Sequence, residues 1–222
     1  MIELDNITSP YISLAGRPKL VTVTGTHRGP RLVFKEVSGH ALRFSGVRIY
    51  SEHEEDAICF DGDVIGADIS APHTVLDGAI TFWGRLENVS VTGFKIVGAH
   101  TGIRCTSALA HKNVSICRNT IENASHEGIY IGPSYKSEPQ LSHVTISGNQ
   151  VSGCGWDGIQ VGNTAMAHIF ENRVHRCGLA RKPGQDYGIT INPGCLAFVS
   201  GNEVTGCAKE FQFLDSRVFS HP

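Results

Sequence analysis

Two carboxylates occupy the same position in two successive repeats of this sequence, which makes them the first residues to consider for chemistry. Glu127 and Asp157 lie 30 residues apart, and each is followed by Gly-Ile. If the two repeats lie side by side as parallel strands, their backbones are about 5 Å apart. A carboxylate pair at that spacing is of the right order for glycoside hydrolysis. The pair could also act in proton abstraction beside a uronate carboxyl, which needs a base and a cation to stabilise the enolate.

Side chains close to the pair in sequence could supply the remaining roles. The candidates for base, acid and cation are Tyr130, His126, Lys136, Arg104 and His111. We therefore predict a catalytic set of Glu127, Asp157, Tyr130 and His126. The competing interpretation is structural: both carboxylates cap the turn before a strand by accepting backbone N–H bonds, and the glycines that follow them fit such a turn.

The elements that must position these residues come from an internal repeat. Four segments align without gaps, 113–125, 143–155, 167–179 and 196–208, and 88–100 fits the same template. One column of the alignment is Asn119, Asn149, Asn172 and Asn202, with Phe94 at the same place. Asparagine tolerates a bend and its amide can bond to the next asparagine in a stack. A second column is apolar and should point inward (Ile96, Ile121, Val151, Val174, Val204), and a third holds small residues (Ala99, Ala124, Cys154, Cys177, Cys207). The cysteines of the third column are best interpreted as small buried hydrophobic residues.

A second strand lies between these units. Segments 126–132, 156–162 and 186–192 share Gly-Ile-x-apolar and alternate between inward and outward positions. Segments 100–105 and 209–215 belong with them, and 40–46, 56–62 and 78–84 fit more loosely. The expected outward column is Arg43, Cys59, Thr81, Arg104, Tyr130, Gln160, Thr190 and Gln212. Extended sugar chains bind polar and aromatic faces of this kind. We predict substrate binding by Arg104, Gln160, Tyr187, Thr190, Trp156 and Lys136, beside projecting loops at 132–142 and 179–187.

The fold that these columns predict is all-β, a single-stranded right-handed parallel β-helix of roughly 7–9 coils, because one coil is too small to bury its own apolar face. Residues 1–222 form one domain, in which 1–38 are irregular first coils or an N-terminal cap and 88–213 are the most regular coils. An antiparallel sandwich is the alternative, but it predicts hairpin turns and no fixed column identities.

The motifs HEGIYIG (His126–Gly132), WDGIQVG (Trp156–Gly162) and GITINPG (Gly188–Gly194) resemble right-handed β-helix repeats of the pectate-lyase-like superfamily. The likeness is closest to secreted bacterial β-helix proteins of unassigned activity. It implies an extracellular or periplasmic location and a carbohydrate-active protein that acts on or binds an extracellular polysaccharide, as a lyase, epimerase or hydrolase. The alternative is a non-catalytic glycan-binding or structural module of a larger surface or tailspike protein. The catalytic motifs of the superfamily are missing: Tyr187-Gly188-Ile189 matches the start of an epimerase motif, but Thr190 and Ile191 replace its Asp and Pro.

Composition limits the other partners. The net charge of -2 and the pI near 6.6 give no reason to expect nucleic acid or a membrane surface. No apolar run is long enough to span a bilayer, and the first residues do not form a signal peptide. The seven cysteines contain no C-x-x-C, so no metal site is predicted from them. An acidic cluster could hold Ca²⁺, but a solvated loop is the simpler interpretation (Glu54, Glu55, Asp56, Asp61, Asp63, Asp68). The ends of the solenoid are the expected surfaces for any oligomer.

Overall fold

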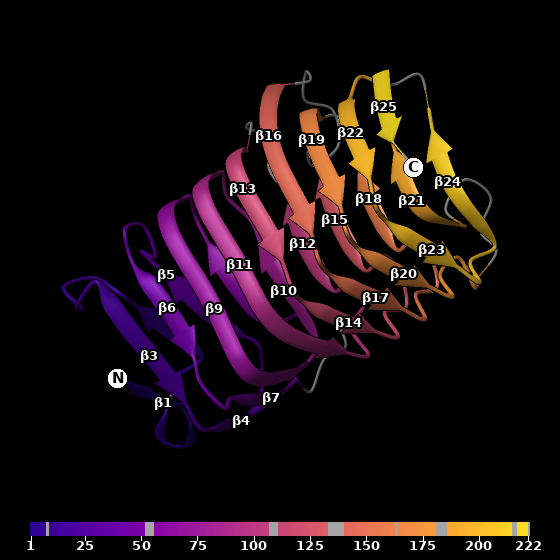
Figure 1. Cartoon of the computed structure of the whole chain (residues 1–222). Helices are drawn as coiled ribbons and strands as arrows, with labels where there is room; N and C mark the ends of the chain where they lie inside the picture. Colours follow the sequence, from indigo (N-terminus) through magenta and orange to yellow (C-terminus); the bar gives the residue numbers. More distant parts are fainter. Residues whose placement is uncertain are drawn as a thin grey trace.

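The computed structural model is a parallel β-helix of about eight turns, with almost no helix. It describes residues 1–7, 9–51, 56–106, 111–132, 140–162, 164–180, 186–214 and 217–221. Figure 1 shows the coils stacked along one axis, from β1 and β3 near the N-terminus to β24 and β25 near the C-terminus. All strand pairs in both sheets are parallel, which confirms the predicted fold class and excludes the antiparallel sandwich.

The strands form two sheets. The nine-stranded sheet consists of β2 (Tyr11–Ser13), β5 (Leu32–Lys35), β8 (Asp56–Asp61), β10 (Ala79–Phe82), β12 (Ile103–Thr106), β15 (Ile129–Gly132), β18 (Ile159–Val161), β21 (Tyr187–Ile191) and β24 (Lys209–Phe213). The main path of the sixteen-stranded sheet is β1 (Ile2–Glu3), β3 (Leu20–Thr24), β6 (Ala41–Phe44), β9 (Val64–Asp77), β11 (Leu86–Val97), β13 (Lys112–Cys117), β16 (Gln140–Ser147), β19 (Thr164–Phe170), β22 (Leu196–Ser200) and β25 (Arg217–His221). Beside that path lie β4 (Thr26–Gly29), β7 (Arg48–Ser51), β14 (Thr120–Glu122), β17 (Gln150–Ser152), β20 (Arg173–His175) and β23 (Glu203–Thr205). A short 3-10 helix, η1 (Leu4–Asn6), follows β1.

The asparagine column forms a hydrogen-bonded ladder at the bend between the first two strands of each coil. The Asn149 amide nitrogen donates to Oδ1 of Asn172 at 2.9 Å, and Asn172 bonds in the same way to Asn202. Each Oδ1 also accepts the backbone N–H of the asparagine one coil below, as Asn149 does from Asn119 at 3.0 Å. At the N-terminal end of the ladder, Oδ1 of Asn119 accepts a hydrogen bond from the backbone N–H of Phe94, the residue predicted at the asparagine position of that coil. Side-chain amides therefore satisfy the buried backbone groups where the chain turns.

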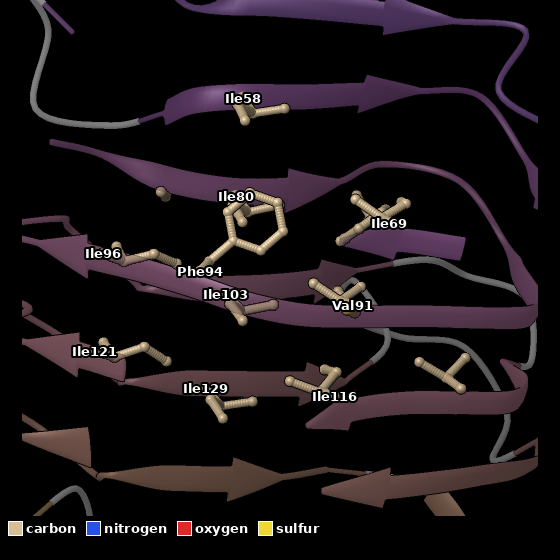
Figure 2. Close-up of a cluster of buried hydrophobic side chains, with 14 of the residues drawn as sticks. Ile58, Ile69, Ile80, Val91, Phe94, Ile96, Ile103, Ile116, Ile121 and Ile129 are labelled. Carbon is tan, nitrogen blue, oxygen red and sulfur yellow. The ribbon is translucent and has the colours of Figure 1, made fainter. Parts of the chain in front are cut away.

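The inward columns form the core. Ile58, Ile80, Ile103 and Ile129 are direct partners on four successive strands of the nine-stranded sheet, and Figure 2 shows them as one row. All are fully buried, as is Val174 in the sixteen-stranded sheet. The column of small residues lies inside as well: Cys154 and Cys177 are buried, and all seven cysteines are free. Both assignments of inward columns are confirmed.

The sequence pattern assigned one strand to the wrong sheet. Segments 56–62 and 78–84 form β8 and β10 of the nine-stranded sheet as expected. Segment 40–46 forms β6 instead, which pairs with β3 and β9 in the other sheet. Arg43 is therefore not part of the outward column, and Val33 is the residue that pairs with Cys59. The error has a physical cause: an alternation of period two marks one buried face and is the same for short strands of either sheet. The first 38 residues contribute β1–β5, each paired in parallel with a later strand.

Candidate functional site

The outward row of the nine-stranded sheet is built as predicted. Arg104 pairs with Tyr130, Tyr130 with Gln160, and Gln160 with Thr190 on four successive strands. Gly132 makes room for the ring of Tyr130, because a Cβ there would lie 2.6 Å from the tyrosine hydroxyl. The row is not uniformly open to solvent. Arg104 and Tyr130 are partly exposed, whereas Gln160 is 8% exposed and Thr190 is fully buried.

The two predicted catalytic carboxylates lie on adjacent coils. The backbone N–H of Gly128 donates to the carbonyl of Asp157 at 3.1 Å, which places Glu127 directly beside Asp157 along the stack. Both side chains are buried, Glu127 with 7% exposure and Asp157 with none. The capping interpretation predicted backbone N–H donors within one turn, but only Asp157 accepts a backbone N–H, and both bonds run between coils. Oε2 of Glu127 accepts the hydroxyl of Thr101 at 3.1 Å, and Oδ1 of Asp157 accepts the backbone N–H of Tyr187 at 2.9 Å.

Burial sets the electrostatics of Asp157. The pKa of its carboxyl is raised to about 6, mainly by loss of solvation and also by the negative charges of Glu127 and Asp186. The Tyr187 N–H and the Thr190 hydroxyl act in the opposite direction and lower the pKa. The carboxyl of Asp157 therefore lies close to Thr190, and the charges that contribute most to its pKa are negative.

An aromatic stack lies next to the carboxylates. The ring of His126 lies 3.6 Å from that of His100 and 3.3 Å from that of Trp156, measured between ring centroids. Tyr187 receives the ammonium group of Lys209 over its ring at 4.7 Å. Lys136 lies outside the described residues. The structure thus brings His126, Trp156 and the two carboxylates together at one edge of the nine-stranded sheet.

A pocket of about 100 Å³ opens one coil away from Glu127, on the N-terminal side. Its lining is polar and aromatic: Asp56, Ala79, Thr81, Trp83, His100, Thr101 and Arg104. The indole of Trp83 is 49% exposed, and the guanidinium of Arg104 lies over it at 5.8 Å from the ring centroid. Asp56 is buried, forms an ion pair with Arg31 at 3.1 Å, and accepts a hydrogen bond from Thr81.

Sequence reasoning missed several residues of this pocket. Thr81 and Arg104 were expected in the outward column, but Trp83 and His100 were not singled out. A signal for His100 was present, because it precedes Thr101-Gly102 just as His126 precedes Glu127-Gly128 and Trp156 precedes Asp157-Gly158. Trp83 follows the last residue of β10, at a position that no repeat column includes.

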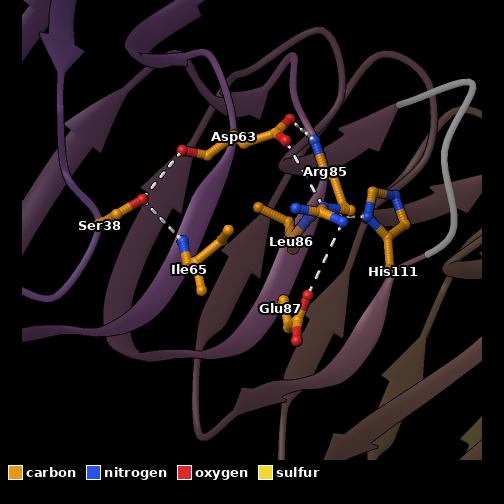
Figure 3. A network of polar contacts seen from close by, with 7 residues as sticks. All are labelled: Ser38, Asp63, Ile65, Arg85, Leu86, Glu87 and His111. Atoms are coloured by element: carbon orange, nitrogen blue, oxygen red, sulfur yellow. Dashed lines mark hydrogen bonds and ion pairs between the residues drawn. The ribbon is translucent and has the colours of Figure 1, made fainter.

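The described acidic residues of the cluster predicted as a solvated loop or calcium site do not converge. Asp61 pairs with Lys35 at 3.4 Å, and Asp68 bonds to the Ser90 hydroxyl. Figure 3 shows Asp63 held by the side chain and backbone of Arg85, with His111 below. Glu54 and Glu55 lie outside the described residues. Among the residues that the structure describes, no three His, Cys, Asp or Glu side chains are placed to hold a metal ion. No helix in the described ranges is long and apolar enough to cross a membrane.

A parallel β-helix with a polar and aromatic row outside one sheet is the class of protein that this fold and site define. Within that class the chain belongs to the NosD family, described as periplasmic copper-binding protein, whose family model matches residues 52–217. The periplasmic description supports the extracellular or periplasmic location expected from the sequence. Searches of curated proteins and of solved structures found no match.

Proposed function

We propose that this protein binds an extracellular polysaccharide on the outer face of the nine-stranded sheet, with one sugar residue in the pocket beside Trp83. The observation that carries the proposal is a half-exposed indole next to a guanidinium and a buried carboxylate. Sugar rings stack their apolar faces on indoles, and their hydroxyls bond to charged groups at the edge. At about 100 Å³ the pocket is smaller than sites that enclose a whole small molecule, so it suits one unit of a chain that continues along the sheet.

Affinity for a panel of alginate, pectin, chondroitin and neutral glycans tests the proposal. Trp83→Ala should reduce the affinity for the bound glycan about tenfold or more, because it removes the stacking surface. Phe198→Ala is the matched control, since Phe198 is a 38% exposed aromatic residue on the other sheet. Binding that is equal in the two variants, or absent for the whole panel, would contradict the proposal.

Processing of the glycan is a second candidate, through lyase, epimerase or hydrolase chemistry. It is favoured by one observation, the location of Glu127 and Asp157 on adjacent coils next to His126 and Tyr130. Incubation with the same panel, with and without calcium, should then release new chain ends or unsaturated products. Loss of that activity in Glu127→Ala at unchanged thermal stability supports catalysis. Loss of stability in a protein without activity supports a non-catalytic module, in which the inter-coil bond from Thr101 is the role of Glu127.

Copper, which the description of the family names, does not fit the described residues. Copper in proteins is held by imidazole, thiolate or thioether ligands. No three of the described histidines and cysteines are placed to hold one metal ion. Burial raises the pKa of the Cys105 thiol, and the neighbouring Cys154 thiol together with burial raises the pKa of Cys177, so neither favours the thiolate form that binds metal. We therefore derive no copper chemistry from this part of the chain.

A further inference from the structure

Four buried oxygen atoms on the outer face of the nine-stranded sheet lack a hydrogen-bond partner. They are Oδ2 of Asp157, Oε1 of Gln160, Oγ1 of Thr190 and Oε1 of Gln212. Gln160, Thr190 and Gln212 are direct partners on β18, β21 and β24, so Thr190 lies between the two glutamines. The hydroxyl of Thr190 lies close enough to the Asp157 carboxyl to lower its pKa, but the two oxygens do not meet hydrogen-bond geometry. An unpaired buried polar group costs about 1–3 kcal/mol, so four in one place need an explanation.

Among the residues that the structure describes, the carboxylate of Asp157 has no ion-pair partner. The Asp157 side chain is fully buried, and its other oxygen is used by the Tyr187 N–H. The charges that contribute most to its pKa are those of Glu127 and Asp186, both negative. Asp186 is itself paired with Lys209 at 3.1 Å. A buried carboxylate beside three further unpaired oxygens is stabilised by a partner that brings positive charge and accepts oxygen lone pairs.

We propose that Asp157, Gln160, Thr190 and Gln212 form a binding site for a hard divalent cation, with Ca²⁺ as the ion of choice. The donors are a carboxylate, two amide carbonyls and a hydroxyl, which is the ligand set that calcium uses, and none is a nitrogen or sulfur atom that would select copper. Calcium takes 6–8 oxygen ligands, so two or more positions remain for water or for sugar hydroxyls. The site shares no residue with the Trp83 pocket, so an experiment can disprove the calcium site without disproving glycan binding, and the reverse.

A calcium titration of the whole protein, freed of metal by a chelator, tests the site. Calorimetry with Ca²⁺ should give one ion per chain, and the melting temperature should rise with calcium concentration. Tb³⁺ provides a second readout, because Trp156 precedes Asp157 and its indole can sensitise terbium emission. Trp156→Phe should lose that emission and keep the heat of Ca²⁺ binding.

Two variants and one control make the result specific. Asp157→Asn keeps Oδ1 for the Tyr187 N–H and should abolish binding, since it removes the charge. Thr190→Val keeps the shape and should weaken binding about tenfold, which tests the site even if the first variant does not fold. Asp61→Asn, at an exposed ion pair with Lys35, should bind like the parent protein.

Two results would overturn the proposal. The first is the absence of binding at Ca²⁺ concentrations up to about 10 mM, above the range of weak extracellular calcium sites. The four oxygens would then hold only buried water. The second is equal affinity in the parent, Asp157→Asn and Thr190→Val, which would place the ion at another surface.

Discussion

Replacement of Asn149 by alanine should be among the most damaging polar substitutions in this protein. The side chain is fully buried and makes four hydrogen bonds. Its oxygen accepts from the backbone and side chain of Asn119, and its nitrogen donates to the Ile116 carbonyl and to Asn172. Alanine leaves the Asn119 backbone N–H without its acceptor, at about 1–3 kcal/mol, and three further bonds are lost at about 0.5–1.5 kcal/mol each. We expect the free energy of unfolding to fall by about 3–6 kcal/mol.

Asn202→Ala is the matched control, because Asn202 also makes four hydrogen bonds but lies at the upper end of the ladder and is partly exposed. Water can replace its contacts, so we expect a loss of only about 1–2 kcal/mol. Chemical denaturation followed by circular dichroism measures both values. Hydrogen exchange should also show faster exchange at the Asn119 amide in Asn149→Ala. An Asn149→Ala loss no larger than that of Asn202→Ala would refute the ladder as a source of stability.

Three further predictions concern the core and its edge. Burial lowers the pKa of His111 to about 4, so the folded state excludes a proton that the unfolded state binds below its ordinary pKa of 6.5. The contribution of His111 to stability should be complete above pH 6.5 and fall by roughly 3 kcal/mol between pH 6.5 and pH 4, while the raised pKa of Asp157 acts in the opposite direction over the same range. The difference in stability between the parent protein and His111→Gln therefore measures the histidine, and a difference that does not change with pH would contradict this. Val174→Asp puts a charge inside the stack and should abolish folding at a cost of several kcal/mol, so a soluble variant with cooperative unfolding would disprove its inward position. Gly158→Ala places a Cβ 2.4 Å from Val174 and 2.7 Å from the Gly188 carbonyl and should cost about 1–3 kcal/mol in denaturation. Gly162→Ala, whose nearest neighbour is a side-chain nitrogen at 3.1 Å, is the control that should lose less.

The predicted columns succeeded because stacking forces equivalent residues into the same environment. Asn149 and Asn172 were expected to touch, and their amides are hydrogen-bonded. The inward position of Val174 followed from the same alignment. The assignment of Arg43 failed because the first coils lack the asparagine and Gly-Ile columns, and alternation alone does not say which sheet a strand joins.

The candidate site was harder to predict than the fold. The repeat identified Arg104, Tyr130, Gln160 and Thr190 as one outward row, and the register agrees. It did not predict that Gln160 and Thr190 would be buried. Exposure of an outward side chain depends on what packs over it from elsewhere in the chain, and a period of two residues holds no information on that contact.

By itself, the sequence determined the architecture, because each coil can bury its apolar side only against its neighbours, and that requirement imposes a regular pattern on the residues. Only the tertiary structure decided where polar groups gather outside that pattern. Trp83, His100 and Arg104 line one pocket because side chains from different coils and from a turn converge there. Thr190 has an unpaired oxygen, and so do Asp157, Gln160 and Gln212 on the two coils beside it. Such convergence depends on distances between coils and on the direction of each side chain, which the order of residues along one coil does not contain.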